Sequence, residues 1–429
     1  MAITQQGWRA GTSGGGGGGL TSLPIENTLY VAKNGNDATG ERNRLDKPFL
    51  TIAGANSVAQ LNDCVYVFSG LYVETGDTFS SGVFYHLEDG ASVTNSAGAL
   101  VRDDGVNAKA INIFGNGRLA TSSRGASCVD LTKSTANIEC YSISGSNGMI
   151  LGGACNIIVR SQIVATEGIG ISLVNDASGY IQFETLNSSG GESGISANTT
   201  TSDDLYIKGM YFSASPLGVL TAQVYNLFNS GLQVITFEIL ETVCLVAYPI
   251  CNASEGNYIF KNGLFNQTTI SVGFQCVDTK IDFINCIILQ STSSSFNIKN
   301  VSSTINLIQC NLDSFAGINI ICDQESITYI QDSVLNTDNQ ELIGANITTS
   351  GTTPILVIAN SQLINGLPLG GGQFSILAQN LLIGETLDIR IQGICVATFP
   401  TSTQIVNLIT GTNIIADTDA ITVPRNKLP

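Results

Sequence analysis

The sequence predicts an all-β chain coiled into a parallel β-solenoid, and two observations lead to this fold class. A pair of apolar residues five positions apart recurs about every 24 residues between Ile113 and Leu363. The composition favours Gly, Ser, Thr, Asn and Ile, only 12% of the residues are charged, and no long segment has helical apolar spacing. A leucine-rich repeat has a similar period, but its recurring Leu-x-x-Leu-x-Leu frame is absent.

The first segment, residues 1–27, is expected to be an extended arm. It holds the only tryptophan, Trp8, and six consecutive glycines follow at 14–19. Such a tract is normally a flexible linker, because its unfolded backbone has much entropy to lose. The arm reads either as an anchoring peptide that docks through Gln5, Gln6, Trp8 and Arg9, or as an arm folded onto its own coil. No secretory signal is predicted, since a charged start followed by an apolar core is missing.

The next segment carries a family motif. It reads YVAKNGND at 30–37, KPFLTIA at 47–53, NDCVYV at 62–67 and SGLY at 69–72. These residues resemble the opening of pectin-lyase-like right-handed parallel β-helix proteins, in which a strand, a Gly-Asn-Asp turn, a Pro-Phe-x-Thr-Ile segment, a short helix over the coil end and a Gly-x-Tyr strand start the solenoid. The resemblance implies a right-handed β-helix over residues 28–365. It leaves function open, since that family includes polysaccharide lyases, hydrolases, surface proteins and many phage or giant-virus virion proteins.

Within the solenoid, pairs of apolar residues five positions apart are the expected inward anchors of successive coils. About 13 coils at the 4.8 Å strand spacing make a rod of roughly 60 Å. After a looser Ile113/Leu119, the pairs are Ile138/Ile143, Ile158/Ile163, Ile181/Leu186, Ile207/Phe212, Ile235/Leu240, Ile259/Leu264, Phe283/Ile288, Leu307/Leu312, Ile330/Leu335 and Ile358/Leu363.

Eleven cysteines are present, and none is part of a CxxC pair. Cys286 and Cys310 each stand three residues after a repeat anchor, which predicts equivalent buried sites on adjacent coils. A metal or disulfide role is the minority interpretation, because a spacing of 24 residues follows the repeat. Free buried thiols favour assembly in a reducing cell.

The charge limits the partners. The net charge is 18 − 34 = −16. No basic stripe could release counterions from phosphates, so nucleic acid is not an expected partner, and acidic polysaccharides are disfavoured for the same reason. No apolar run approaches the length that spans a bilayer, so membrane insertion is not expected.

Candidate catalytic residues are few. His86 is the only histidine, and Asp203-Asp204 superficially resembles the adjacent aspartates of polygalacturonase-like hydrolases. Those enzymes also have a Gly-His-Gly motif, which is absent here, and an Arg-x-Lys segment on a later coil. The only Arg-x-Lys of this chain is at residues 425–427, at the extreme C-terminus and outside the repeats. Asp103-Asp104 reads as a turn. Two carboxylates from different coils could still form a glycosidase pair.

Lyase chemistry would need a calcium-binding carboxylate cluster and a base. The candidate acids are scattered one per strand or corner, and solvation of the corners explains them equally well. They are Asp278, Asp282, Asp313, Asp323 and Asp332, with Lys280 and Lys299 as the bases among them. We therefore expect no enzymatic activity, no cofactor and no metal site.

The last segment, residues 366–429, is expected to be a small C-terminal antiparallel β domain that caps the helix and pairs with copies of itself. A glycine-rich breaker run precedes short segments with alternating apolar faces at 374–377, 385–391, 394–397 and 405–408. This series resembles the first half of the small β-sandwich tips of viral fibre proteins.

The expected function is that of a virion structural protein, a homotrimeric spike, fibre or capsid-associated appendage assembled in the host cytoplasm and located in the virion. Its expected partners are capsid, portal or tail proteins, with a host surface glycan as a further candidate. The rival interpretation is a polysaccharide-degrading tailspike, either hydrolase or lyase, and a third is a cellular surface adhesin.

Overall fold

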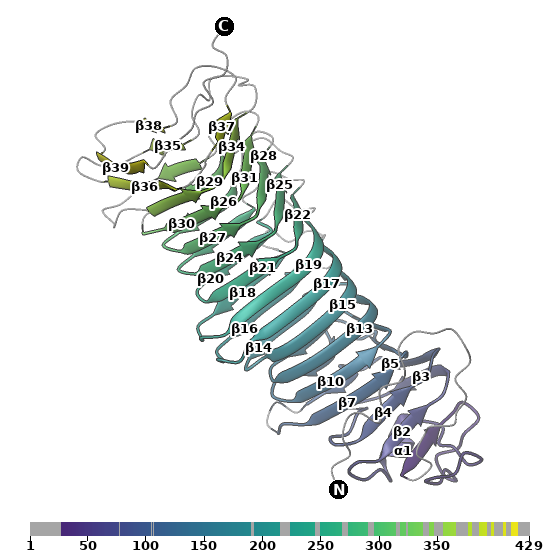
Figure 1. Cartoon of the computed structure of the whole chain (residues 1–429). Coiled ribbons are helices and arrows are strands. Elements are labelled where there is room, and N and C mark those ends of the chain that lie inside the picture. The colour runs from purple at the N-terminus through teal and green to yellow at the C-terminus, as the bar shows by residue number, and fades with distance from the viewer. Residues whose placement is uncertain are drawn as a thin grey trace.

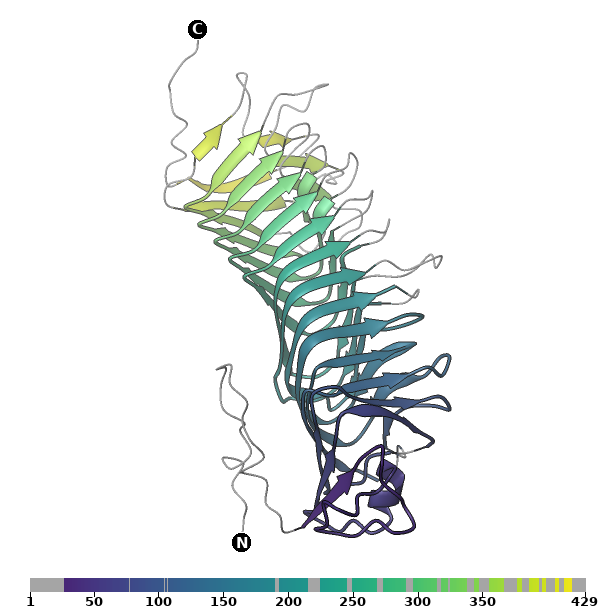
Figure 2. The same ribbon diagram turned by 90° about the vertical axis from the view of Figure 1, so that its right-hand side faces the viewer.

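The structure, a computed structural model, is an elongated parallel β-solenoid (Figure 1). Its coils stack one above another along the rod, as the turned view in Figure 2 shows. It describes residues 27–76, 78–103, 105, 107–189, 193–214, 224–244, 249–267, 273–290, 296–314, 318–322, 325–337, 343–346, 355–365, 376–379, 386–392, 396–398, 406–408 and 413–418.

Each coil contributes strands to three faces of the rod. The first and second faces form one 26-stranded sheet, because four long strands in the middle of the rod run across both. The third face is a separate 13-stranded sheet. Two of its strands, β35 (Ile376–Gln379) and β38 (Val406–Leu408), lie beyond residue 365, where the shaft was expected to end.

The strands fall into four groups. The first face holds β1 (Thr28–Val31), β2 (Cys64–Val67), β4 (Phe84–Leu87), β7 (Ala110–Gly115), β10 (Thr135–Cys140), β21 (Asn257–Lys261), β24 (Lys280–Ile284), β27 (Thr304–Ile308), β30 (Ile327–Gln331), β33 (Ile355–Ala359), β36 (Thr386–Gln392) and β39 (Asn413–Thr418). The second holds β3 (Gly70–Glu74), β5 (Ala91–Asn95), β8 (Arg118–Thr121), β11 (Ser142–Gly145), β22 (Leu264–Gln267), β25 (Ile287–Gln290), β28 (Asn311–Ser314), β31 (Val334–Thr337), β34 (Gln362–Asn365) and β37 (Val396–Thr398). The long strands across both are β13 (Ala154–Ala165), β15 (Ser178–Ser188), β17 (Leu205–Ala214) and β19 (Val234–Cys244). The third holds β6 (Val101–Arg102), β9 (Ser127–Leu131), β12 (Asn147–Leu151), β14 (Ile171–Asn175), β16 (Ile195–Thr199), β18 (Tyr225–Asn229), β20 (Cys251–Ser254), β23 (Phe274–Val277), β26 (Phe296–Val301), β29 (Ile318–Cys322), β32 (Ile343–Asn346), β35 (Ile376–Gln379) and β38 (Val406–Leu408).

The core is a set of columns in which equivalent side chains of successive coils stack. Each such side chain contributes about 1.5–3 kcal/mol by leaving water. In the first-face column every member is at most 1% exposed. From coil to coil it runs through Ile113, Ile138, Ile157, Ile181, Ile207, Phe237, Phe260, Phe283, Leu307, Ile330 and Ile358.

This column confirms the inward anchors in most coils and corrects them in three. In those coils apolar residues occupy both alternating positions of the strand, so the spacing alone selects the wrong phase; a shift of one residue turns a side chain to the other face. The displaced anchors, each followed by the residue that points inward instead, are Ile158 (Ile157), Leu240 (Thr242), Ile259 (Phe260) and Leu264 (Phe265). Ile235 is buried as predicted and lies two residues before the column residue Phe237.

Two corners of the coil are turned by residues in the left-handed region. Asn, Asp and similar polar residues tolerate this conformation best after glycine. Between the first and second faces these residues have φ from 48° to 56° and are Asn262, Asn285, Gln309, Asp332 and Asn360. Between the third and first faces they have φ from 48° to 59° and are Asn175, Glu255, Asp278, Ser302 and Glu325.

A small buried residue follows each of these corners between the first and second faces; after Asn262 it is Gly263, and in the next four coils it is a Cys or Ser whose side chain bonds the coil before it. The Cys310 N–H donates to Ser333 Oγ (3.0 Å), and the Ser333 N–H donates to Ser361 Oγ (3.2 Å). Ser333 Oγ in turn donates to the Gln331 carbonyl (2.7 Å). The side chains therefore satisfy N–H groups that the turn removes from the sheet ladder.

The N-terminal end of the rod carries the short helix that the family resemblance implies, α1 (Ile52–Asn56). Asp37 accepts hydrogen bonds from the N–H groups of Leu50 and Thr51 and from the Thr51 hydroxyl. Glu74, only 4% exposed, accepts from the Ile52 N–H (2.9 Å). The motif residues thus build the cover of the first coil.

The antiparallel expectation for the C-terminal segment is wrong for its described strands. β36 pairs in parallel with β33, β37 with β34, and β38 with β35. β39 pairs in parallel with β36. An alternating apolar face is common to half-buried strands of either direction, so it does not determine pairing. These strands continue the two sheets of the shaft.

Candidate functional site

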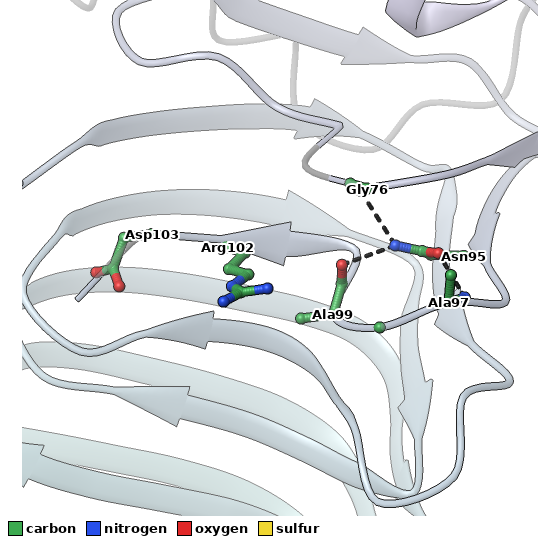
Figure 3. A pocket seen from close by; sticks show the side chains of 7 residues that line it. Gly76, Asn95, Ala97, Ala99, Arg102 and Asp103 are labelled. Carbon is green, nitrogen blue, oxygen red and sulfur yellow. Dashed lines mark hydrogen bonds between the residues drawn. The ribbon is translucent and has the colours of Figure 1, made fainter.

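A cavity of about 260 Å³ lies where the chain turns from β5 on the second face to β6 on the third (Figure 3). The Asn95 side chain crosses it and donates to the carbonyls of Gly76 (3.1 Å) and Ala99 (2.8 Å). The lining residues are Gly76, Asn95, Ala97, Gly98, Ala99, Arg102 and Asp103.

Asp103 is fixed at one end of this cavity. Its carboxylate accepts from the Lys133 N–H (2.9 Å), the Ser134 hydroxyl (2.8 Å) and the Gly105 N–H (3.0 Å). Burial acts to raise the pKa of Asp103, but these hydrogen bonds together lower it below its usual value. The reading of Asp103 as a turn residue is therefore correct, and Asp104 lies outside the described residues.

Asp130 stands opposite Arg102 in the register of β6 and β9. Burial, and then the charge of Asp103, raise the pKa of Asp130, while Arg102 acts in the other direction. Asp103 thus lines the cavity, Asp130 lies opposite the lining residue Arg102, and their environments move the pKa values of the two carboxyl groups apart. Sequence reasoning missed this pair, because Asp130 meets Arg102 only through the register of two strands that are one coil apart.

His86, by contrast, belongs to an aromatic stack. On β4, its ring lies 4.8 Å from that of Tyr66 with an angle of 10° between the planes. Burial lowers the pKa of His86 below its usual value, and Glu88 and Glu139 oppose this effect in part. A neutral, half-buried imidazole stacked on a tyrosine is a packing group.

Asp203 and Asp204 lie at the corner before β17, and each accepts a hydrogen bond from the next coil. The Asp204 carboxylate accepts from the Val234 N–H on the next coil (3.0 Å), and the Asp203 carbonyl accepts from the buried Gln233 side chain (2.7 Å). The strands β7, β10, β13 and β15 separate this corner from His86. The structure does not bring these candidates together.

The scattered acids that lyase chemistry would use take part in contacts between coils. Asp282 accepts from Asn306 (2.5 Å), and Asp313 accepts from Asn336 (3.2 Å). Asp278 and Asp332 turn corners, and Asp323 lies outside the described residues. In the part of the chain that the structure describes, no three His, Cys, Asp or Glu side chains gather as a metal site would require.

The ten described cysteines are all free and buried. Cys286 and Cys310 occupy equivalent positions on adjacent coils, as predicted: each thiol donates to a carbonyl of the coil before it, Phe260 (3.3 Å) and Phe283 (3.3 Å) respectively. Burial raises the pKa of Cys128 and of Cys155 to about 12. Such thiols pack as small apolar groups.

The predicted anchoring residues Gln5, Gln6, Trp8 and Arg9 lie outside the described residues. Comparison of the chain with protein-family models, with curated proteins and with solved structures finds no match in any of the three. Among the described residues, no helix is long and apolar enough to cross a membrane.

Proposed function

We propose that this chain is a virion structural protein, the shaft of a spike, fibre or capsid-associated appendage. The observation that supports a mechanical role is the use of outward polar side chains as links between coils. Asn137 donates to Asn112 (3.1 Å), and Asn285 donates to Asn262 (3.0 Å). Together with the Asp282 and Asp313 contacts, these links join the coil of β7 to that of β10 and neighbouring coils between β21 and β31.

In this proposal the shaft is a homotrimer, anchored by residues 1–27 to a capsid, portal or tail protein. A large negative charge keeps such rods apart in solution except where specific contacts hold them. Trp8 and Arg9 are the docking residues, since tryptophan and arginine dominate interface energies.

The experiment removes residues 1–20 and follows the chain by mass spectrometry of purified particles. We expect wild-type chain in the particles and folded, truncated chain only in the lysate. A change of Trp8 and Arg9 to alanine should have the same effect, with Trp8→Phe as a partial rescue. Truncated chain in particles at the wild-type level would contradict the anchoring role.

A specific observation favours a second candidate, the polysaccharide-degrading tailspike. Asp103 lines the cavity and Asp130 lies opposite the lining residue Arg102. The pKa values of the two carboxyl groups shift in opposite directions, and such pairs are typical of acid–base assignments. Purified protein should leave host polysaccharide intact if the shaft is structural. Depolymerisation that is lost in Asp130→Asn, and retained in Asp203→Asn, would favour the enzyme.

A further inference from the structure

The corner between the first and second faces has an uncharged exposed residue in each of five successive coils. We call this line the Met210 ridge, and it consists of Met210, Leu240, Asn262, Asn285 and Gln309. The first two are large apolar side chains that are 56% and 51% exposed. They lie side by side, because the residues on either side of them pair in register between β17 and β19.

The apolar surface continues from this ridge onto the second face. Leu264 on β22 and Ile287 on β25 pair in register and point outward, and Ile287 is 42% exposed. Five coils at the strand spacing and four residues of extended chain cover roughly 20 Å by 15 Å, or about 300 Å². This area holds the apolar side chains together with the three amides, and surface patches of about this size on monomers are often functional.

The corner between the third and first faces has the opposite character. We call it the acidic ridge, and it holds Asp176, Asp203, Asp204, Glu255 and Asp278, all exposed. Carboxylates only accept hydrogen bonds and repel their like, so this ridge cannot contact its own equivalent.

We propose that the Met210 ridge is the surface through which copies of this chain associate side by side. In a cyclic assembly whose axis is parallel to the rod, equivalent coils of every copy lie at one height, and a residue at the axis meets its own equivalents. At the axis, the Met210 and Leu240 side chains of each copy are buried against those of the other copies. The amides of Asn262, Asn285 and Gln309 both donate and accept, so each can bond its own copy.

The charge pattern supports a second copy as the occupant. Each chain carries a net charge of −16, so copies repel unless the contact avoids the acids. With the Met210 ridge at the axis, the contact avoids the acidic ridge, which turns at another corner of the coil. At the ridge's own corner position, exposed carboxylates stand only at its two ends, as Glu184 before Met210 and Asp332 after Gln309. This inference rests on the homotrimeric shaft of the proposed function and names its contact face.

The test is sedimentation velocity of the purified full-length chain over a range of concentrations. We expect wild type to associate, and Leu240→Glu or Met210→Glu to lower the association constant at least tenfold. Leu232→Glu is the matched control: Leu232 is 82% exposed and lies in the turn before β19 on the acidic-ridge corner. It should associate as wild type does.

A second measurement covers variants that fail to fold. Leu240→Cys should form a disulfide between chains under mild oxidation, and Leu232→Cys should not. A monomeric wild type, unchanged association of Leu240→Glu, or equal cross-linking at both positions would overturn the proposal. The association measurement in solution does not depend on the virus particle. A chain that associates but is not incorporated into particles would overturn only the proposed virion role. A chain that is incorporated as a monomer would overturn only the proposed contact through the Met210 ridge.

Discussion

The contribution of a single residue to the stability of this solenoid depends on whether its side chain points into the core or out of the strand. Leu307 is fully buried in the first-face column, whereas Ile259 is half-buried on the outside of β21, next to the buried Phe260. Both are aliphatic residues with similar neighbours in the sequence, so only the strand phase separates them.

We therefore predict a contrast between two alanine variants. Leu307→Ala should lower the free energy of unfolding by about 3 kcal/mol, because a cavity remains in a core that cannot collapse. Ile259→Ala should cost less than about 1 kcal/mol, as surface substitutions do. Urea unfolding followed by circular dichroism measures both, and equal losses would show that the phase assigned to β21 is wrong.

His86 provides a pH-dependent prediction. Its folded-state pKa is lowered, so the unfolded chain binds more protons just below the ordinary histidine pKa of about 6.5. The contribution of His86 is present above that pH and is lost as the pH falls toward the folded-state pKa. His86→Phe keeps the stack on Tyr66 and should make stability less dependent on pH between 7.5 and 5. A slope as steep as that of wild type in thermal melts would contradict this account.

For single residues, the sequence predicts which residue types enter the core. The prediction of the inward residue fails where two adjacent positions of a strand are both apolar. Ile157-Ile158 and Ile259-Phe260 offer a core residue in either phase. The structure resolves the choice through register, since Ile157 stacks on Ile138 and Phe260 on Phe237. Register depends on the neighbouring coil, and no window of one coil contains that information.

Elements are held together at their corners as well as along their strands. Cys286, Cys310, Ser333 and Ser361 follow left-handed corner residues on successive coils. Thiol and hydroxyl are used interchangeably there, because each is small and both donates and accepts.

This equivalence predicts the effect of changing Ser333. Ser333→Ala leaves the buried Cys310 N–H without its acceptor and should cost about 1–3 kcal/mol of unfolding free energy. Ser333→Cys places the side chain of the two preceding coils at this corner and should cost clearly less. Chemical denaturation of the two variants decides it: if the order is reversed, the side chain of residue 333 does not satisfy the corner.

The sequence also predicted where elements occur better than how they pair. The strands near 376 and 386 were expected, and the structure places β35 and β36 there. Their direction was wrong, since parallel pairing comes from stacking on β32 and β33. The candidate site shows the same limit: Asp103 and Asp130 are 27 positions apart in the sequence and become neighbours only through β6 and β9.

The whole molecule is a rod whose sheets run from β1 to β39. A solenoid of this kind transmits force and position along its axis, because each coil contacts mainly its two neighbours and all coils share one core. Such a molecule is suited to act as a spacer between a particle and what lies outside it.

Electron cryomicroscopy of particles from the source of this sequence tests that role most directly. We predict projecting density of stacked coils, roughly 70 Å long, with the N-terminal end at the particle and the Met210 ridges of neighbouring copies in contact. Particles that lack such density, while the folded chain remains free in the lysate, would contradict the proposal that this protein is a virion shaft.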